Sequence, residues 1–198
     1  MLAINKRLEL VASYVENKRL ADIGSDHAYL PIFLAKEGKL DYAIAGEIVE
    51  GPHKVSIKNV KEEGLSDIIE CRKAAGLDAI TLEDNIEVIT ICGMGGKLIS
   101  DILEDGKDKL INKPNLILQP NVGECFVREK LQKLGYNIVA ENIIEEDGNI
   151  LTAIGASAAL PYSFKLLSYY LDEEKLHELQ TLMCYDKVCD TFCSFDKY

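Results

Sequence analysis

The fold is decided by the stretch Arg19-Leu-Ala-Asp-Ile-Gly-Ser-Asp-His-Ala-Tyr-Leu-Pro31. Its apolar start is typical of a short buried strand, which breaks at Gly24, and a helix is expected from about Tyr29 through Glu37. Open α/β sheets hold nucleotides on this arrangement of strand, tight turn and helix N-terminus. Taken alone, the pattern is weak evidence for a nucleotide-binding site, because Ser25 or Asp26 could simply cap the helix.

The residues of this turn indicate which nucleotide it binds. A dinucleotide-binding turn needs three glycines, but only Gly24 is present, and Asp26 and Tyr29 stand near the other two positions. A carboxylate that faced a pyrophosphate would repel it. The ammonium and sulfonium of S-adenosylmethionine are attracted by Asp22 and Asp26 instead, so we expect an adenosyl cofactor without phosphates.

Outward from this stretch, strands and helices alternate along the chain. Five strands are expected at residues 20–23, 41–47, 67–71, 86–92 and 115–119, with helices between them. This alternation predicts an α/β fold with a parallel sheet covered on both faces. Asp147-Gly148 joins two further β segments, 136–145 and 149–155, and predicts a hairpin that adds one antiparallel strand to the sheet. We therefore expect a cofactor-binding catalytic domain at residues 1–160 and a short helical tail at 161–198, with its helix at 166–182.

Composition restricts the partners. The 198 residues carry a net charge of −11, which is unfavourable for non-specific binding of nucleic acid, so a nucleic-acid partner must meet a local basic patch. The six cysteines include no Cys-x-x-Cys pair, and we expect reduced thiols and no metal. Without an 18-residue apolar run or a secretory signal, the protein is expected in the cytoplasm, away from membranes, as a monomer.

Unusual residues follow several of the expected strands. The second strand ends at Glu47, whose carboxylate can accept hydrogen bonds from ribose hydroxyls. Gly93-Met94-Gly95-Gly96 follows the fourth strand. Because three of these four residues have no side chain, the cofactor and the substrate can both approach the backbone closely. Gln119-Pro120-Asn121 follows the fifth strand and supplies amides that can read a base edge. Because parallel strands end at one edge of the sheet, these groups are expected to converge on one adenosyl site.

Five motifs in this order resemble the bacterial tRNA adenine-22 N1-methyltransferase family: Asp22–Pro31, Gly51-Pro52, Cys92–Gly96, Leu118–Asn121 and Glu145–Gly148. The resemblance covers roughly residues 4–156. It implies a Rossmann-like class I methyltransferase fold, S-adenosyl-L-methionine as cofactor and tRNA as substrate. It also implies a helical C-terminal domain for tRNA, for which the 38 residues after Leu160 are short.

From the strand ends and this resemblance we expect a set of site residues. The expected cofactor-binding residues are Asp22, Ile23, Gly24, Ser25, Asp26, His27, Glu47, Ile48, Gly76, Leu77, Gly93 and Met94. The expected substrate-binding residues are Gly95, Gly96, Gln119, Pro120 and Asn121. Ala74-Ala75 stands where the family often has a polar residue, so backbone contacts to the cofactor adenine are expected there.

The expected reaction is an in-line attack of adenine N1 on the sulfonium methyl, on a base that is unpaired or flipped out. The expected catalytic residues are Asp26, Tyr29 and Asn121. Asp26 would stabilise the developing positive charge or receive an N6 proton, Tyr29 would stack on the base or belong to the core, and Asn121 would hydrogen-bond the adenine edge. His27 ranks below Asp26, and Cys92 is interpreted as a packing residue.

Contacts to tRNA are expected from local groups of basic residues: Lys6 with Arg7; Lys54, Lys58 and Lys61; Lys107, Lys109 and Lys113; and Arg128 with Lys130 and Lys133. Three alternatives stay open at this point. They are a methyltransferase of a small molecule or protein, an NAD-dependent oxidoreductase, and a cofactor-binding module without catalysis.

Overall fold

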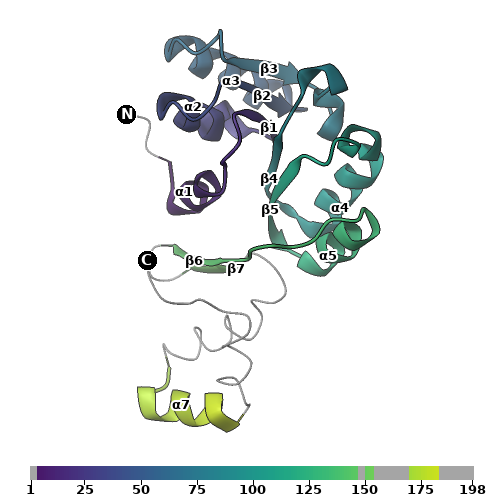
Figure 1. Ribbon diagram of the computed structural model, residues 1–198. Coiled ribbons are helices and arrows are strands. Elements are labelled where there is room, and N and C mark those ends of the chain that lie inside the picture. Colours follow the sequence, from purple (N-terminus) through teal and green to yellow (C-terminus); the bar gives the residue numbers. More distant parts are fainter. Residues whose placement is uncertain (1–3, 147–149, 154–169, 183–198) are drawn as a thin grey trace. The chain divides into compact units, whose positions relative to one another are not determined.

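The computed structural model describes residues 4–146, 150–153 and 170–182 (Figure 1). Contacts divide the chain into two compact units, residues 1–156 and 157–198. The first unit contains the sheet and the predicted site. In the second unit the structure describes the helix α7 (Glu173–Leu182). The expected helix is wrong at residues 170–172, which form a turn and bend, while residues 166–169 and the expected domain boundary near residue 160 lie outside the described residues.

Five parallel strands form the sheet of the first unit, in the order β3-β2-β1-β4-β5. Their bounds are β1 (Arg19–Ile23), β2 (Tyr42–Glu47), β3 (Ile69–Lys73), β4 (Val88–Gly95) and β5 (Asn115–Val122). The chain builds outward from β1 to β3, then returns and builds in the other direction from β4. The strand order therefore reverses between β1 and β4, the place where open α/β sheets bind ligands.

Helices cover both faces of this sheet (Figure 1). They are α1 (Lys6–Ser13), α2 (Tyr29–Lys36), α3 (Glu50–Glu62), α4 (Gly96–Asp105) and α5 (Glu124–Lys133). Neighbouring strand residues alternate between two hydrophobic clusters: Leu20 packs with residues of α1, α2 and α3, and Ala21 packs with residues of α4 and α5. The predicted doubly covered parallel sheet is thus confirmed.

Three strands run further than the sequence predicted: β3 ends at Lys73, two residues past its expected end, and β4 and β5 also continue. The expected ends at residues 92 and 119 are wrong, because β4 continues to Gly95 and β5 to Val122. The two strands keep pairing with each other there, with register shifts between Cys92, Met94 and Gly95. Glycine tolerates such bulges, so a glycine run that usually ends a strand bends this one instead.

The expected hairpin is present as strands β6 (Ile143–Glu146) and β7 (Ile150–Ala153), which pair antiparallel. They form a separate two-stranded sheet, and within the described residues neither strand joins β5. β6 is also shorter than expected, because residues 136–142 are irregular. The expected turn at Asp147-Gly148 lies outside the described residues. Over the ranges that the structure covers, we find no helix with the length and apolarity to cross a membrane.

Candidate functional site

The loop after β1 is held in a strained shape. The backbone N–H groups of Gly24 and Ser25 both donate to the Gly46 carbonyl, at 2.9 and 3.0 Å, which ties the tips of β1 and β2 together. His27 and Ala28 then adopt positive φ angles of 64° and 59°, in the left-handed region that costs a residue with a side chain roughly 1–2 kcal/mol. The Asn59 side chain donates to the His27 carbonyl at 3.0 Å and supports this shape. Such strain is typical of functional loops.

Helix capping, the ordinary explanation of this turn, does not hold. The N-cap residue of α2 is Ala28, which has no capping side chain, and Ser25 makes no side-chain cap before the short turn η1 (Asp26–Ala28). The buried Ser25 hydroxyl has no hydrogen-bond partner among the described residues. Its polar group is therefore available to a ligand.

Asp22 lies in the same buried spot. Its side chain is only 7% exposed, and its Oδ1 accepts a hydrogen bond of 2.6 Å from the Thr90 hydroxyl. Burial raises the pKa of the Asp22 carboxyl, and the nearby Ser25 and Thr90 hydroxyls oppose the shift. A cation beside Asp22 would favour its ionised form, so this position suits an ammonium group.

A cavity of about 310 Å³ lies at the tips of β1, β2 and β4. A Cβ added to Gly24 would come within 2.1 Å of the Met94 terminal methyl, so the wall of the cavity depends on glycine there. The expected site residues in this wall are Ile23, Gly24, Ile48, Gly76, Leu77 and Met94. The α4 residues Leu98, Asp101, Ile102 and Asp105 also line it, and sequence reasoning missed them. Leu98 is 52% exposed, but this exposure is set by how α4 packs, so no signal in the sequence could have found these residues.

Two expected acidic residues adjoin this wall in the sequence without being part of it. Asp22 and Glu47 are buried one residue before the wall residues Ile23 and Ile48, and are not themselves in the wall. Glu47 Oε1 accepts from the Val49 N–H at 2.7 Å, and its other oxygen makes no hydrogen bond to a described residue.

Asp26, His27 and Tyr29 form a separate cluster outside the cavity. His27 Nε2 lies 3.4 Å from Asp26 Oδ1, and the His27 and Tyr29 rings meet edge to face with centroids 5.4 Å apart. The Asp26 side chain is 73% exposed. Asp26 lies in the short turn η1 after β1 and Tyr29 begins α2, whereas Asn121 lies near the end of β5, and no hydrogen bond within the described ranges links Asp26 or Tyr29 to Asn121.

The expected base-reading residues do come together. Gln119 Oε1 accepts from the Gly93 N–H at 3.0 Å, and Gln119 Nε2 donates to Asn121 Oδ1 at 3.1 Å. Asn121 Nδ2 in turn donates to the Gly93 carbonyl at 2.9 Å. Arg7 of α1 also donates to Gln119 Oε1. Arg7 was expected only as a tRNA contact, because no spacing in the sequence links α1 to the ends of β4 and β5.

Of the remaining expected residues, Gly95 has free space around it, whereas Gly96 and Pro120 are packed against neighbouring atoms. No atom lies within 4 Å of a Cβ built on Gly95, whereas one on Gly96 would lie 2.0 Å from the Gly123 carbonyl oxygen. Gly96 and Pro120 are buried and support the strand ends. Burial raises the pKa of the Cys92 thiol to about 12, which keeps it protonated and agrees with a packing role. The part of the chain that the structure covers contains no cluster of three metal-ligating side chains.

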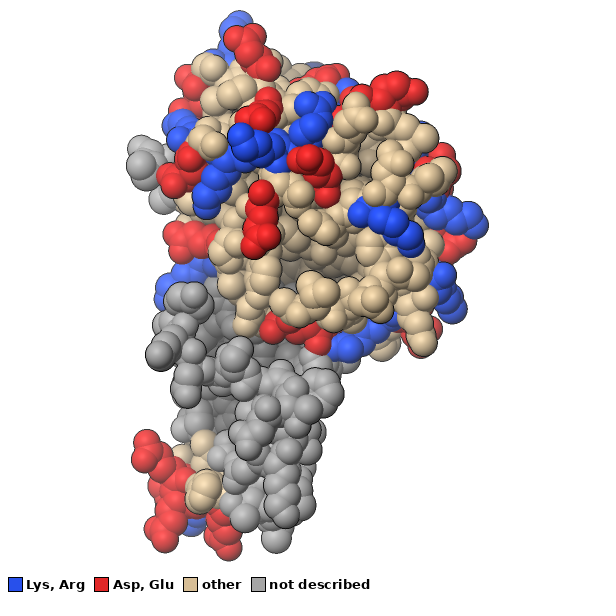
Figure 2. All heavy atoms as spheres, viewed as in Figure 1, with Lys and Arg blue, Asp and Glu red and all other residues tan. Residues whose placement is uncertain are grey.

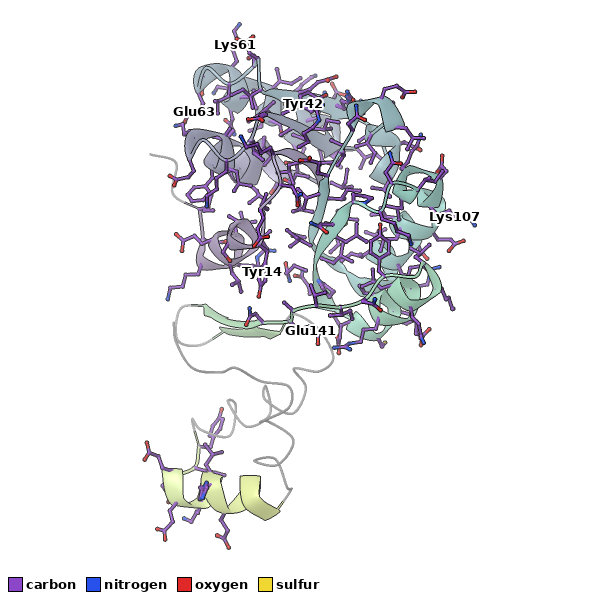
Figure 3. All side chains as sticks on the ribbon, viewed as in Figure 1. Tyr14, Tyr42, Lys61, Glu63, Lys107 and Glu141 are labelled. Carbon is purple, nitrogen blue, oxygen red and sulfur yellow. The ribbon has the colours of Figure 1, made fainter. Side chains whose placement is uncertain are left out.

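A second cavity, of about 480 Å³, runs along the outer edge of β5. Tyr14 and Glu141, both labelled in Figure 3, line it, and of the expected site residues only Gln119 and Pro120 reach it. Because it contains none of the expected cofactor residues, the smaller cavity is the candidate cofactor site.

Most of the expected tRNA contacts are already paired with carboxylates. Lys54 pairs with Glu50, Lys58 with Glu62, both Lys107 and Lys130 with Glu104, Lys109 with Asp108, and Arg128 with Glu141. Figure 2 shows basic and acidic side chains interspersed over the face in view. Within the described part of the chain, Lys6, Arg7, Lys61, Lys113 and Lys133 form no ion pair.

The sequence of this chain is similar to those of known tRNA methyltransferases. A family model described as tRNA (adenine(22)-N(1))-methyltransferase matches residues 20–177. A tRNA (adenine(22)-N(1))-methyltransferase of Bacillus subtilis (strain 168) is 46% identical over 158 residues, which are 79% of this chain and 66% of that protein. The match thus spans just under two thirds of the length of that relative.

Solved structures give the same result. The B. subtilis m1A22 tRNA methyltransferase TrmK is similar with a TM-score of 0.73 and 37% identity, over 100% of this chain and 91% of that one. A Streptococcus pneumoniae protein in complex with S-adenosyl-L-methionine has a TM-score of 0.73 and 46% identity, over 90% and 87% of the two chains. M. capricolum TrmK, solved in complex with S-adenosyl-homocysteine, has a TM-score of 0.69 and 26% identity, over 96% of this chain and 99% of that one.

Proposed function

Because the chain belongs to the tRNA (adenine(22)-N(1))-methyltransferase family, we propose that it transfers a methyl group from S-adenosyl-L-methionine to N1 of adenine 22 in tRNA. The observation that carries this proposal is the buried pair of Asp22 and Ser25, whose hydroxyl makes no hydrogen bond of normal geometry to a described residue, beside a cavity at the strand-order reversal. The site fits a cationic adenosyl compound and offers no cradle for a pyrophosphate.

The residues present fit the cofactor part by part. Asp22 and Ser25 would hold the ammonium of its amino-acid end. The free oxygen of Glu47 would accept from ribose hydroxyls. Ile48 and Leu77, two apolar wall residues, would enclose the adenine ring.

When bound, S-adenosyl-L-methionine supplies a methyl group that joins the adenine N1 lone pair while the carbon–sulfur bond breaks and leaves its electron pair on sulfur. In a base-paired adenine, N1 accepts a hydrogen bond from the partner base, so the target base must be unpaired or flipped out before it can react. Asn121 would hold its edge, exposed Tyr29 would stack on it, and the exposed Asp26 carboxylate would stabilise the positive charge of the product. The chain contributes orientation and exclusion of water.

The proposed substrate agrees with the expected cytoplasmic location, and a monomeric state stays a prediction. Of the alternatives, a methyltransferase of small molecules or proteins would leave tRNA unlabelled, and an oxidoreductase would bind NAD.

Methyl transfer from radiolabelled S-adenosyl-L-methionine to an unmodified bacterial tRNA transcript, with enzyme in excess, tests the proposal. We expect label in this transcript, none in a matched transcript with guanine in place of adenine 22, and calorimetric binding of S-adenosyl-homocysteine but not of NAD. Equal labelling of both transcripts, or no labelling of either, would contradict it.

A further inference from the structure

We propose that Arg7 is a positioning residue for the target base: through Gln119 it fixes the orientation of the Asn121 amide on which the flipped adenine lies. This inference rests on the proposed function and names a specificity device of the same site. Arg7 precedes the first strand, and the proposed mechanism gives its side chain no role.

Helix α1 places the Arg7 guanidinium at the ends of β4 and β5. Val11 and Ala12, one turn further along α1, are buried in the cluster that covers this face of the sheet, so the helix is held against it. A Cβ built on Gly93 would lie 3.2 Å from Arg7 Nη1, so the guanidinium lies directly over the Gly93 backbone. No carboxylate within the described residues pairs with Arg7, and its bond to Gln119 is therefore its principal contact.

The hydrogen-bonding groups determine the orientation of both amides. A guanidinium and a peptide N–H can only donate, so the two donors Arg7 and Gly93 require the oxygen of Gln119 to face them. Gln119 Nε2 must then face Asn121, which accepts through Oδ1. Asn121 Nδ2 is left to donate to the Gly93 carbonyl, which can only accept. Neither amide can be reversed without placing donor against donor or acceptor against acceptor.

This orientation leaves Asn121 with groups that match adenine. Asn121 is exposed and keeps one N–H and one oxygen lone pair that no other described residue uses. Asparagine pairs with adenine by accepting from N6 and donating to N7. That pairing leaves N1 free to react. Guanine carries an acceptor, O6, in place of the N6 amine and would face the Asn121 oxygen unfavourably.

A double-mutant cycle tests this arrangement. Arg7→Met should lower kcat on tRNA by about tenfold with the KM for tRNA within about twofold, because the amides lose their fixed orientation while the binding surface stays. Asn121→Ala should lower kcat at least as much, and the double variant should be no slower than Asn121→Ala alone. The matched control, Glu9→Gln at an exposed position of the same helix, should leave kcat unchanged, and Arg7→Lys, which keeps one donor, should recover part of the rate.

Gln119→Glu separates positioning from a structural role. A glutamate still accepts from Arg7 and Gly93 but cannot donate to Asn121. The variant also loses the hydrogen bond to the Pro120 carbonyl, so it should lose some thermal stability, but we expect it to fold and to keep its S-adenosyl-homocysteine affinity, with kcat reduced about tenfold. Full activity of this variant would contradict the proposal, as would strictly additive effects in the cycle.

Two further results would also overturn it. If Arg7→Met raised only the KM for tRNA and reduced the slope of log affinity against log salt concentration by about one, Arg7 would be a phosphate contact. If the wild-type enzyme did not methylate tRNA, the proposed function would fail and this inference with it. Normal wild-type methylation together with a fully active Arg7→Met enzyme would overturn the inference alone.

Discussion

Two glycines of the site differ in what surrounds them, which separates a binding role from a packing role. A Cβ on Gly24 would meet the movable end of the Met94 side chain, whereas one on Gly96 would meet the Gly123 backbone. Gly24→Ala should therefore fold with a loss of about 1 kcal/mol, from its positive φ of 70°, because Met94 can shift. The new methyl and the displaced Met94 then fill the cavity, and S-adenosyl-homocysteine should bind at least about tenfold more weakly.

Gly96→Ala is the matched comparison. Rigid backbone cannot give way, so this variant should lose about 3 kcal/mol or more of unfolding free energy. Thermal or urea unfolding together with calorimetric titration checks both variants. Normal cofactor affinity in folded Gly24→Ala would contradict the cavity assignment.

The buried carboxyl of Asp22 predicts a pH dependence of cofactor binding. Burial raises the pKa of Asp22, and a cationic ligand prefers its ionised form. As the pH falls through this raised pKa, the carboxyl takes up a proton, and affinity for S-adenosyl-homocysteine should fall by up to about tenfold per pH unit. Asp22→Asn should bind weakly with little pH dependence, while Asp26→Asn, a change at an exposed carboxylate, should keep the wild-type slope. A wild-type affinity that stayed constant as the pH was lowered to the point where the protein unfolds would argue against Asp22 as the ammonium partner.

At the scale of elements, a network around Arg72 holds the segment that carries part of the cavity wall. Arg72 on β3 donates to both oxygens of Asp84, at 2.7 and 2.8 Å, and to the Ala79 carbonyl at 2.9 Å. It also donates to the hydroxyl of Tyr42, labelled in Figure 3, at 3.0 Å. Ala79 ends the short turn η2 (Gly76–Ala79), whose residues Gly76 and Leu77 line the cavity. The network therefore links the sheet edge to the candidate cofactor site.

This network predicts a loss of stability in acid. The hydrogen bonds from Arg72 lower the pKa of Asp84 from 3.8 to about 2. Because the folded pKa lies below the unfolded one, the stabilisation is complete above about pH 4 and is lost as the pH falls toward 2. It amounts to about 2 kcal/mol. Asp84→Asn should lose this amount at pH 7 and show less further loss in acid, whereas exposed Asp108→Asn should follow the wild type in urea unfolding at each pH. Equal acid sensitivity of all three proteins would contradict this role.

At the scale of the whole molecule, the sequence predicted what local patterns encode. Runs such as Val88–Ile91 are buried on both faces and could only be central parallel strands, so the sheet followed from them. The strand-end residues Gly24, Ile48 and Met94 meet at one cavity because parallel strands end together. Arg7 and Asp101 come from helix faces that reach the site only after packing, and no spacing in the chain reveals them. The pairing of β4 with β5 past Cys92 was missed for the same reason: the partner strand, not the glycine-rich sequence, holds it extended.

The most direct test of the central claim is to identify the methylated atom and its position. Unmodified tRNA incubated with the enzyme and S-adenosyl-L-methionine is cut by sequence-specific nucleases, and the fragments and nucleosides are identified by mass spectrometry. We expect one N1-methyladenosine per tRNA, in the fragment that contains adenine 22. Methyl groups on N6, at another position or absent from tRNA altogether would contradict it.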